Sequence, residues 1–151
     1  MENLSKEEQI LFLNSLLEKA KEDKIEKFVV GAVIQDNNQI LLLRRPSDDF
    51  MGGINELPSG NLEAGEGLFE ALIREVKEET NLDLKDLKKY LGTFDYLSGS
   101  GKKARQFNFL ITVEDNGTVQ LTEHDEHYWA DENHEALEKV TDSVKEILKK
   151  I

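Results

Sequence analysis

The chain has 151 residues, a length that suits one domain with a substantial core. It carries 31 Asp plus Glu against 19 Lys plus Arg, a formal net charge of -12, which disfavours binding to nucleic-acid polymers and to anionic membranes. The lack of cysteine excludes disulfides, thiol nucleophiles and Cys-ligated metal centres. The first residues are polar and no apolar run approaches the roughly 18 residues of a membrane span, so we expect a cytoplasmic protein without a membrane partner.

The N-terminal part predicts a helix followed by a β-hairpin. Ser5 and Glu8 have the spacing of a capping box. Apolar residues then recur at helical intervals on one face, at Ile10, Leu13, Leu16, Leu17 and Ala20. An apolar run over residues 28–34, turn residues at 36–38 and a second apolar run over 40–43 predict the hairpin.

The middle of the chain predicts a loop, a helix and two strands. Residues 46–65 contain both prolines and several glycines, so we expect mostly loop. A stretch of strong helix formers predicts a helix over 67–80. Polar and apolar residues alternate over 106–113, which indicates a strand, and residues 90–97 are its predicted partner across a loop at 98–103.

A turn, a short strand and two short helices are expected toward the C-terminus. The turn is predicted at Asn116-Gly117 and the strand at 127–130. Asp131 is expected to cap a helix that ends at Lys139. Thr141 or Asp142 should cap the last helix, with inward-facing Val144, Ile147, Leu148 and Ile151. Strands mixed with helices on a chain of this size predict a layered α/β (α+β) sandwich.

The helix predicted over 67–80 carries a ridge of carboxylates. At 100° per residue Glu75, Glu78 and Glu79 share one sector of the helix, because side chains three and four residues apart lie on the same face. A different sector is expected to face the core and holds Phe69, Leu72, Ile73 and Val76. Like charges at these spacings destabilise a helix, and a divalent cation would reverse that effect.

A glutamate-rich helix face is most often simply solvated. Two neighbouring features favour a functional interpretation instead. Residues 57–60 form a Gly-containing loop whose backbone can approach a phosphate or donate a carbonyl to a metal. Arg74 precedes the first glutamate and can orient a carboxylate by charge-assisted hydrogen bonds.

These residues together resemble the Nudix box of the Nudix hydrolases, in particular the MutT-like branch. Gly60, five further residues, Glu66, seven further residues and then residues 74–82 follow the spacing of that motif. One signature glycine is Asn81 here, and Asn is the usual substitute for Gly at a left-handed position after a helix. Other departures are Asn55 and Ser59, both near the expected substrate entrance, which bear on substrate identity.

The resemblance extends over about residues 26–150. It implies an N-terminal helical extension over 1–24 and a Nudix domain over 25–151. The implied fold of that domain is a mixed β-sheet between helices. It also implies hydrolysis of a nucleoside diphosphate derivative with Mg²⁺ or Mn²⁺. Hard divalent cations prefer oxygen ligands, which the carboxylates and backbone carbonyls of this chain provide.

The resemblance assigns roles to individual residues. It implies that the metal ligands are Glu75, Glu78 and Glu79, with a carbonyl of Ser59 or Gly60. Arg74 would orient a ligand and Glu66 would support the helix and the loop. The general base is left open between Glu75, Glu79 and Glu123. The predicted substrate-binding residues are Arg44, Arg45 and Glu56. The two arginines lie at the end of a predicted strand, where arginine side chains are otherwise expected to be solvated.

The leading hypothesis is therefore a Mg²⁺-dependent pyrophosphohydrolase of a nucleoside triphosphate or a related nucleotide. The alternatives are a hydrolase of ADP-ribose or of a dinucleoside polyphosphate, and a nucleotide-binding module without activity. His124 and His127 are expected to be surface residues and Trp129 a packing residue. The N-terminal helix is expected to pack either on its own domain or on a second subunit of a homodimer.

Overall fold

The computed structural model describes residues 1–49, 51–115 and 117–151. The turn predicted at Asn116-Gly117 therefore falls partly outside the described residues. The elements, in chain order, are α1 (Lys6–Glu22), β1 (Lys27–Asp36), β2 (Gln39–Arg44), β3 (Asn55–Glu56), β4 (Ser59–Asn61), α2 (Leu68–Thr80), β5 (Leu84–Leu97), β6 (Lys103–Val113), β7 (Glu126–Ala130), the 3₁₀ helix η1 (Glu135–Lys139) and α3 (Asp142–Leu148).

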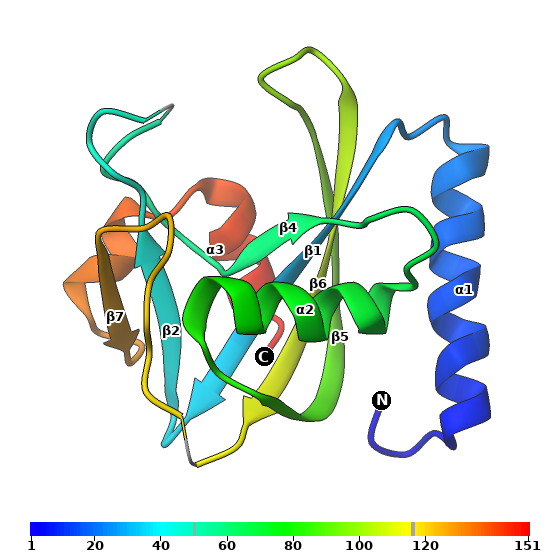
Figure 1. Ribbon diagram of the computed structural model, residues 1–151, viewed down its shortest axis with the longest axis horizontal. Helices are drawn as coiled ribbons and strands as arrows, with labels where there is room; N and C mark the ends of the chain where they lie inside the picture. Colours follow the sequence, from blue (N-terminus) through cyan, green and yellow to red (C-terminus); the bar gives the residue numbers. More distant parts are fainter. Residues whose placement is uncertain (50, 116) are drawn as a thin grey trace.

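The strands form a mixed sheet in the order β3-β2-β1-β6-β5, with β4 paired to β1 and β7 paired to β2. The β1–β6 pair is parallel, whereas the other pairs are antiparallel. Figure 1 shows α2 in front of the sheet, α3 behind it and α1 along one side. The predicted α/β (α+β) sandwich with a mixed sheet is therefore confirmed.

The core has two halves, one on each face of the sheet. Alternate residues of β2 serve the two halves, since Leu41 and Leu43 lie on the side of α1 and α2 while Ile40 and Leu42 lie on the side of η1 and α3. This period of two is the geometry of a strand whose two faces are both covered. Trp129 packs against the first half, as predicted.

The N-terminal helix forms as the sequence predicts. The Ser5 hydroxyl accepts a hydrogen bond from the Glu8 backbone at 3.1 Å, and the Glu8 carboxylate accepts one from the Ser5 backbone at 3.2 Å. The helix packs on its own domain, with the Phe12 ring 5.4 Å from that of Tyr90. Ile10 is 57% exposed, so its predicted inward orientation is wrong: the buried stripe of α1 runs through Phe12, Leu13 and Ala20.

The C-terminal helices differ from the prediction in their caps. Asp131 does not cap a helix but accepts a hydrogen bond from the Asn133 backbone in a turn, and the short 3₁₀ helix begins after His134. Thr141 caps α3 by accepting from the Val144 backbone at 3.3 Å. Ile151 lies beyond the end of α3 and is exposed, so its predicted inward orientation is wrong.

Helix α2 is also rotated relative to the prediction. Phe69 and Ile73 are 39% and 42% exposed, although both were predicted to face the core. Its buried face instead contains Leu68, Ala71, Leu72, Val76, Glu79 and Thr80. Glu79 therefore belongs to the buried face of α2, which hydrophobicity by itself does not predict.

Candidate functional site

The strand β4 brings the backbone of the 57–60 loop against the carboxylate ridge. It pairs with β1 through Gly31 opposite Ser59 and Val30 opposite Gly60. A Cβ atom on Gly60 would lie only 2.0 Å from the Glu75 carboxyl carbon. A side chain at position 60 would therefore displace the Glu75 carboxylate from its present place.

Arg74 is the centre of a dense ion-pair cluster on α2. Its guanidinium binds both oxygens of Glu66, at 2.7 and 2.8 Å, and donates to the Asn61 carbonyl at 2.9 Å. Its remaining amino group donates to Glu75 at 2.7 Å and to Glu78 at 3.1 Å. The bidentate contact lowers the pKa of Glu66 to about 2, mainly through the Arg74 hydrogen bonds.

The carboxylates next to this cluster are not neutralised in the same way. Burial raises the pKa of Glu75 in spite of its contact with Arg74. Glu79 is more affected: burial, with the nearby charges of Glu75, Glu56 and Glu123, raises its pKa to about 9. A hydrogen bond from the Ser59 backbone offsets only part of that effect.

A histidine connects the ridge to β3. The Nε2 atom of His124 lies 2.7 Å from the Glu56 carboxylate, and its Nδ1 atom lies 3.9 Å from Oε2 of Glu79. Both Nδ1 of His124 and Oε2 of Glu79 are buried without a hydrogen-bond partner among the described residues. The His124 side chain is only 7% exposed, so the prediction of a surface residue is wrong.

The spacing of His124 and His127 can bind a metal on a helix, but the two residues lie beside a predicted strand, so the sequence favours surface positions and does not predict His124 as a site residue. The available signal was its position directly after Glu123, in the segment that resembles the family. His124 and Glu56 are 68 positions apart in the chain, and local spacing does not encode a contact between residues so distant.

The predicted substrate-binding arginines lie at the end of β2 and are both paired. Arg45 contacts both oxygens of Glu56 at 3.4 Å and Asp49 at 3.1 Å. Arg44 is bound to Asp125 at 2.8 Å. The structure thus brings Arg45 and Glu56 next to His124, while Arg44 is paired with Asp125.

Two further predicted residues lie at the solvent side of the site. The Glu78 side chain is 55% exposed, and Glu123 is exposed as well. Residues 120–122 are tied to the end of α2, since the Thr122 hydroxyl donates to the Glu78 carbonyl and the Gln120 backbone donates to the Thr80 carbonyl. Glu123 is thereby close enough to influence the pKa of Glu79.

The turn after α2 matches the prediction for Asn81. This residue caps the helix in the left-handed conformation, with φ of 67° and ψ of 9°. Asn tolerates that conformation better than other non-glycine residues, which explains why it can replace the glycine of the motif.

Asn55, which its place in the motif predicts to lie near the substrate entrance, is a buried residue. It is 2% exposed on β3, and its amide donates to the Ala136 carbonyl at 2.8 Å. The side chain is directed away from Glu56 because consecutive residues of a strand point to opposite faces.

The donor set fits a hard divalent cation. It consists of carboxylates, and the buried Glu79 oxygen has no hydrogen-bond partner within the described part of the chain. Within residues 1–49, 51–115 and 117–151, no three His, Asp or Glu side chains already form a metal cage. Glu75 and Glu78 are paired with Arg74, so these two carboxylates would have to turn away from it to bind an ion.

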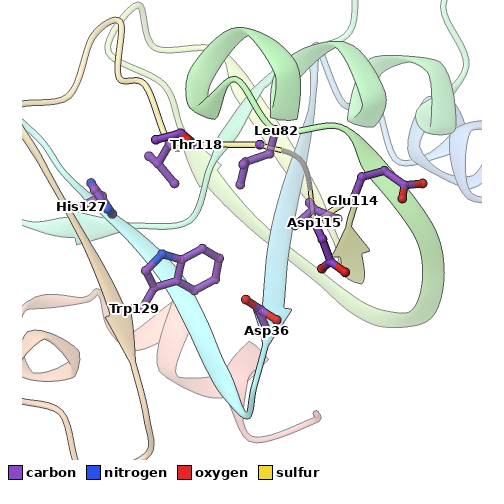
Figure 2. A pocket seen from close by; sticks show the side chains of 10 residues that line it. Asp36, Leu82, Glu114, Asp115, Thr118, His127 and Trp129 are labelled. Atoms are coloured by element: carbon purple, nitrogen blue, oxygen red, sulfur yellow. The ribbon is translucent and has the colours of Figure 1, made fainter.

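A separate hollow of about 350 Å³ lies beyond the end of α2 (Figure 2). The Trp129 indole forms one wall, and Asp36, Glu114 and Asp115 bring carboxylates to its rim. None of the predicted catalytic or metal-binding residues lines it. The predicted catalytic and metal-binding residues therefore lie at the α2 ridge and not in this hollow.

A family model described as NUDIX domain matches residues 26–151. The chain belongs to this family. Among solved structures, this Nudix chain is similar to the MutT protein from Methanosarcina mazei Go1, with a TM-score of 0.69, 26% identity and coverage of 82% of this chain and 90% of that one. The E. coli ORF135 protein gives a TM-score of 0.68, 27% identity and coverage of 85% and 90%.

Curated relatives match a shorter part of this Nudix chain. An ADP-ribose pyrophosphatase of Methanocaldococcus jannaschii is 42% identical over 65 residues, which are 43% of this chain and 37% of that protein. An 8-oxo-dGTP diphosphatase of Escherichia coli is 36% identical over 56 residues, 37% of this chain and 43% of that protein. The chain thus spans about two fifths of the length of these relatives. Among the described residues no helix is long and apolar enough to cross a membrane.

Proposed function

We propose that this Nudix protein is a pyrophosphohydrolase that uses Mg²⁺ or Mn²⁺ to cleave the diphosphate of a nucleoside triphosphate or a related nucleotide. The observation that carries the proposal is Glu79, a buried carboxylate with a pKa of about 9 that faces other carboxylates and has an oxygen without a partner in the described chain. Added positive charge relieves that repulsion, and Nudix proteins generally use divalent metals.

In this proposal the carboxylates of α2 and the adjacent loop hold the ion. Glu75, Glu78 and Glu79 supply oxygens, with a carbonyl of Ser59 or Gly60. A divalent ion held there would supply Lewis acidity, which would lower the pKa of an attacking water, and positive charge to balance the diphosphate. This explains how a chain of net charge -12 binds a polyanionic substrate.

The remaining residues position these groups. Arg74 holds Glu66 in a bidentate contact and reaches Glu75, so it keeps the first ligand in register with the Gly60 loop. Water attacks a phosphorus atom, the bridging phosphorus–oxygen bond breaks, and a carboxylate accepts the proton of the water. Glu75, Glu79 and Glu123 remain the candidates for that base.

The relatives named above act on ADP-ribose and on 8-oxo-dGTP, and a further relative is named a CTP pyrophosphohydrolase. All three substrates present a diphosphate linked to a nucleoside. The proposed substrate class is therefore a nucleotide with this shared group, and a nucleoside triphosphate is the member that we favour.

We also propose that the Nudix domain begins at residue 25 and that residues 1–24 extend it with α1. The cytoplasm is the proposed location. A homodimer is a prediction that a mass measurement in solution tests, since a monomer at high concentration would contradict it.

The test is hydrolysis of a nucleotide panel by the purified protein with Mg²⁺, with Mn²⁺ and with chelator. The panel includes the four ribonucleoside triphosphates, 8-oxo-dGTP, ADP-ribose and a dinucleoside polyphosphate, and the products followed are phosphate, pyrophosphate and nucleoside monophosphate. Turnover that chelator abolishes is the expected result. Nucleotide binding without turnover across the panel would contradict the proposal and favour a binding module.

A further inference from the structure

Two buried side chains face each other beside the α2 ridge without a hydrogen bond between them. Nδ1 of His124 lies 3.9 Å from Oε2 of Glu79, and neither atom has a hydrogen-bond partner among the described residues. The His124 side chain is 7% exposed and that of Glu79 is 11% exposed, so water has little access to either. Buried polar atoms are rarely left unpaired, so these two atoms point to a ligand between them.

The hydrogen bond on the other side of the imidazole ring shows which nitrogen has a free lone pair. Nε2 of His124 lies 2.7 Å from Oε1 of Glu56. An ionised carboxylate can only accept a hydrogen bond, so Nε2 carries the proton and donates it to Glu56. In a neutral imidazole the other nitrogen then has no proton. Nδ1 of His124 therefore presents a lone pair to Glu79.

Glu79 presents a lone pair to the ring from the opposite side. A hydrogen bond from the Ser59 backbone holds its carboxylate, and because Oε2 has no partner, that bond reaches the other oxygen. Glu79 has to be ionised to bind a metal ion, and it then has no proton to donate to Nδ1. A first-row divalent ion at about 2.1 Å from each atom spans at most about 4.2 Å, so one ion can bind both after a small closing movement.

Glu56 prepares His124 for binding a metal ion. Histidines that bind metals in proteins usually donate their second N–H group to a carboxylate, which fixes the tautomer and the orientation of the ring. Glu56 is such a carboxylate, and Arg45 contacts it in turn at 3.4 Å. The arrangement of Glu56, His124 and Glu79 therefore matches a supporting carboxylate, a nitrogen ligand and an oxygen ligand in a row.

A nitrogen ligand narrows the kind of ion that the site prefers. Mg²⁺ demands an octahedron of oxygen ligands, whereas first-row transition-metal ions also accept an imidazole nitrogen. No three His, Asp or Glu side chains form a metal cage in the part of the chain that the structure describes. The remaining positions around an ion at His124 and Glu79 are therefore left to water, a backbone carbonyl or oxygens of the substrate.

We propose that Nδ1 of His124 is a nitrogen ligand of the ion that Glu79 binds and that this ligand makes the site prefer transition-metal ions to Mg²⁺. The proposal rests on the proposed function, because Glu79 is the shared ligand, and of the two ions named there it selects Mn²⁺. His127 is not part of this site, since it lies on β7 and lines the separate hollow beyond α2 (Figure 2).

The first test detects the nitrogen ligand directly. Pulsed EPR of Mn²⁺ bound to the purified protein, without nucleotide, records the magnetic coupling between the ion and nitrogen nuclei that are bonded to it. We expect a coupling that changes when the histidines carry a different nitrogen isotope. His124→Gln, which keeps an amide donor for Glu56, should abolish this coupling, and His127→Gln should retain it. A spectrum of the unchanged protein without coupling to a histidine nitrogen would overturn the proposal.

Metal affinities separate a ligand from a residue that only supports the fold. The EPR signal of free Mn²⁺ gives the Kd of Mn²⁺, and competition with Mn²⁺ gives that of Mg²⁺. His124→Gln should weaken Mn²⁺ binding at least about tenfold and Mg²⁺ binding less than about threefold, because only the transition-metal ion loses a nitrogen contact. His127→Gln should change neither affinity. Equal losses for the two ions in His124→Gln would overturn the proposal.

Thermal denaturation in chelator checks that both variants fold. If His124→Gln does not fold, the isotope-labelled spectrum of the unchanged protein still decides the question.

The two proposals fail in different ways, because metal binding is measured without turnover. Mn²⁺ bound to a histidine in a protein that hydrolyses none of the nucleotide panel would contradict the proposed function and leave the His124 ligand standing. Hydrolysis that chelator abolishes, without coupling to a histidine nitrogen, would do the reverse. A protein that binds no Mn²⁺ would contradict both.

Discussion

Arg105 and Arg74 each hold a cluster of ion pairs, and the carboxylates around the two arginines behave differently. Arg105 on β6 binds both oxygens of Asp95, at 2.7 and 2.9 Å, and reaches Asp23 after α1 at 2.8 Å. These hydrogen bonds lower the pKa of both aspartates. Each carboxylate in this cluster is therefore more readily ionised than in the unfolded chain, which is the expected behaviour of a structural contact.

Arg74 makes more ion pairs than Arg105, but its single positive charge does not balance the carboxylates around it. The pKa of Glu66 is lowered to about 2, whereas burial raises the pKa of Glu75 and brings that of Glu79 to about 9. The number of ion pairs thus does not separate a site from a structural cluster. The separation comes from the charges that the fold leaves unbalanced, which require either a proton or an added cation to neutralise them.

The largest expected effect follows from removing an unbalanced charge. Glu79→Gln should lower turnover by about 100-fold or more, and Glu78→Gln should also lower it strongly, because each removes a proposed ligand. Glu70→Gln, at an exposed position of the same helix, should retain activity. Steady-state kinetics with saturating Mg²⁺ make the measurement, and full activity of the Glu79 variant would exclude this residue from the site.

A second test moves a carboxylate without removing it. In Gly60→Ala the new methyl group meets the end of the Glu75 side chain, which can rotate away. We expect turnover to fall at least about tenfold while the free energy of unfolding changes by less than about 1 kcal/mol. Denaturant titration is measured beside the kinetics, and a large loss of stability would show that the backbone and not Glu75 had moved.

The comparison also predicts how the stability of the metal-free protein depends on pH. The pKa of Glu79 is about 9 in the folded protein, against its ordinary value of 4.5. The folded state therefore binds the extra proton, and stability should fall as pH rises from about 5 to 9. Mg²⁺ should raise the melting temperature more at pH 8 than at pH 6, because the ionised carboxylate binds it.

Glu79→Gln separates this contribution from other titrations. The variant should show a flatter dependence of melting temperature on pH in chelator and a smaller gain from Mg²⁺. A variant that kept the full slope would place the responsible group elsewhere in the chain.

The smallest effect is expected in the structural cluster. Asp95→Asn removes one charge next to Arg105, and because the Asp95 side chain is 40% exposed the loss of stability should stay below about 1 kcal/mol. Turnover should be unchanged. A loss of activity comparable to that of the Glu79 variant would remove the distinction between the two clusters.

Features set by neighbours along the chain were predictable. The capping box at Ser5, the helix over 68–80, the left-handed Asn81 and the hairpin of β1 and β2 follow from spacing and turn chemistry. The ridge of Glu75, Glu78 and Glu79 follows from helical geometry in the same way. The motif spacing from Gly60 to Leu82 indicated the family before any tertiary contact was known.

The wrong predictions share a cause. Phe69 and Ile73 are as apolar as Leu72, and only the position of the sheet decides which of them is buried. His124 reaches Glu56 from 68 residues away, and Asn55 turns into the opposite core half to meet Ala136. No pattern within a short window contains these partners.

By itself, the amino-acid sequence determined which residues carry the charge of the α2 ridge, because helical periodicity and motif spacing are local properties. Only the tertiary structure decided which of those carboxylates is buried with one oxygen that has no hydrogen-bond partner among the described residues. Glu79 differs from Glu78 because β4, His124 and Glu56 close over it, and burial next to like charges changes a pKa only when distant segments have met.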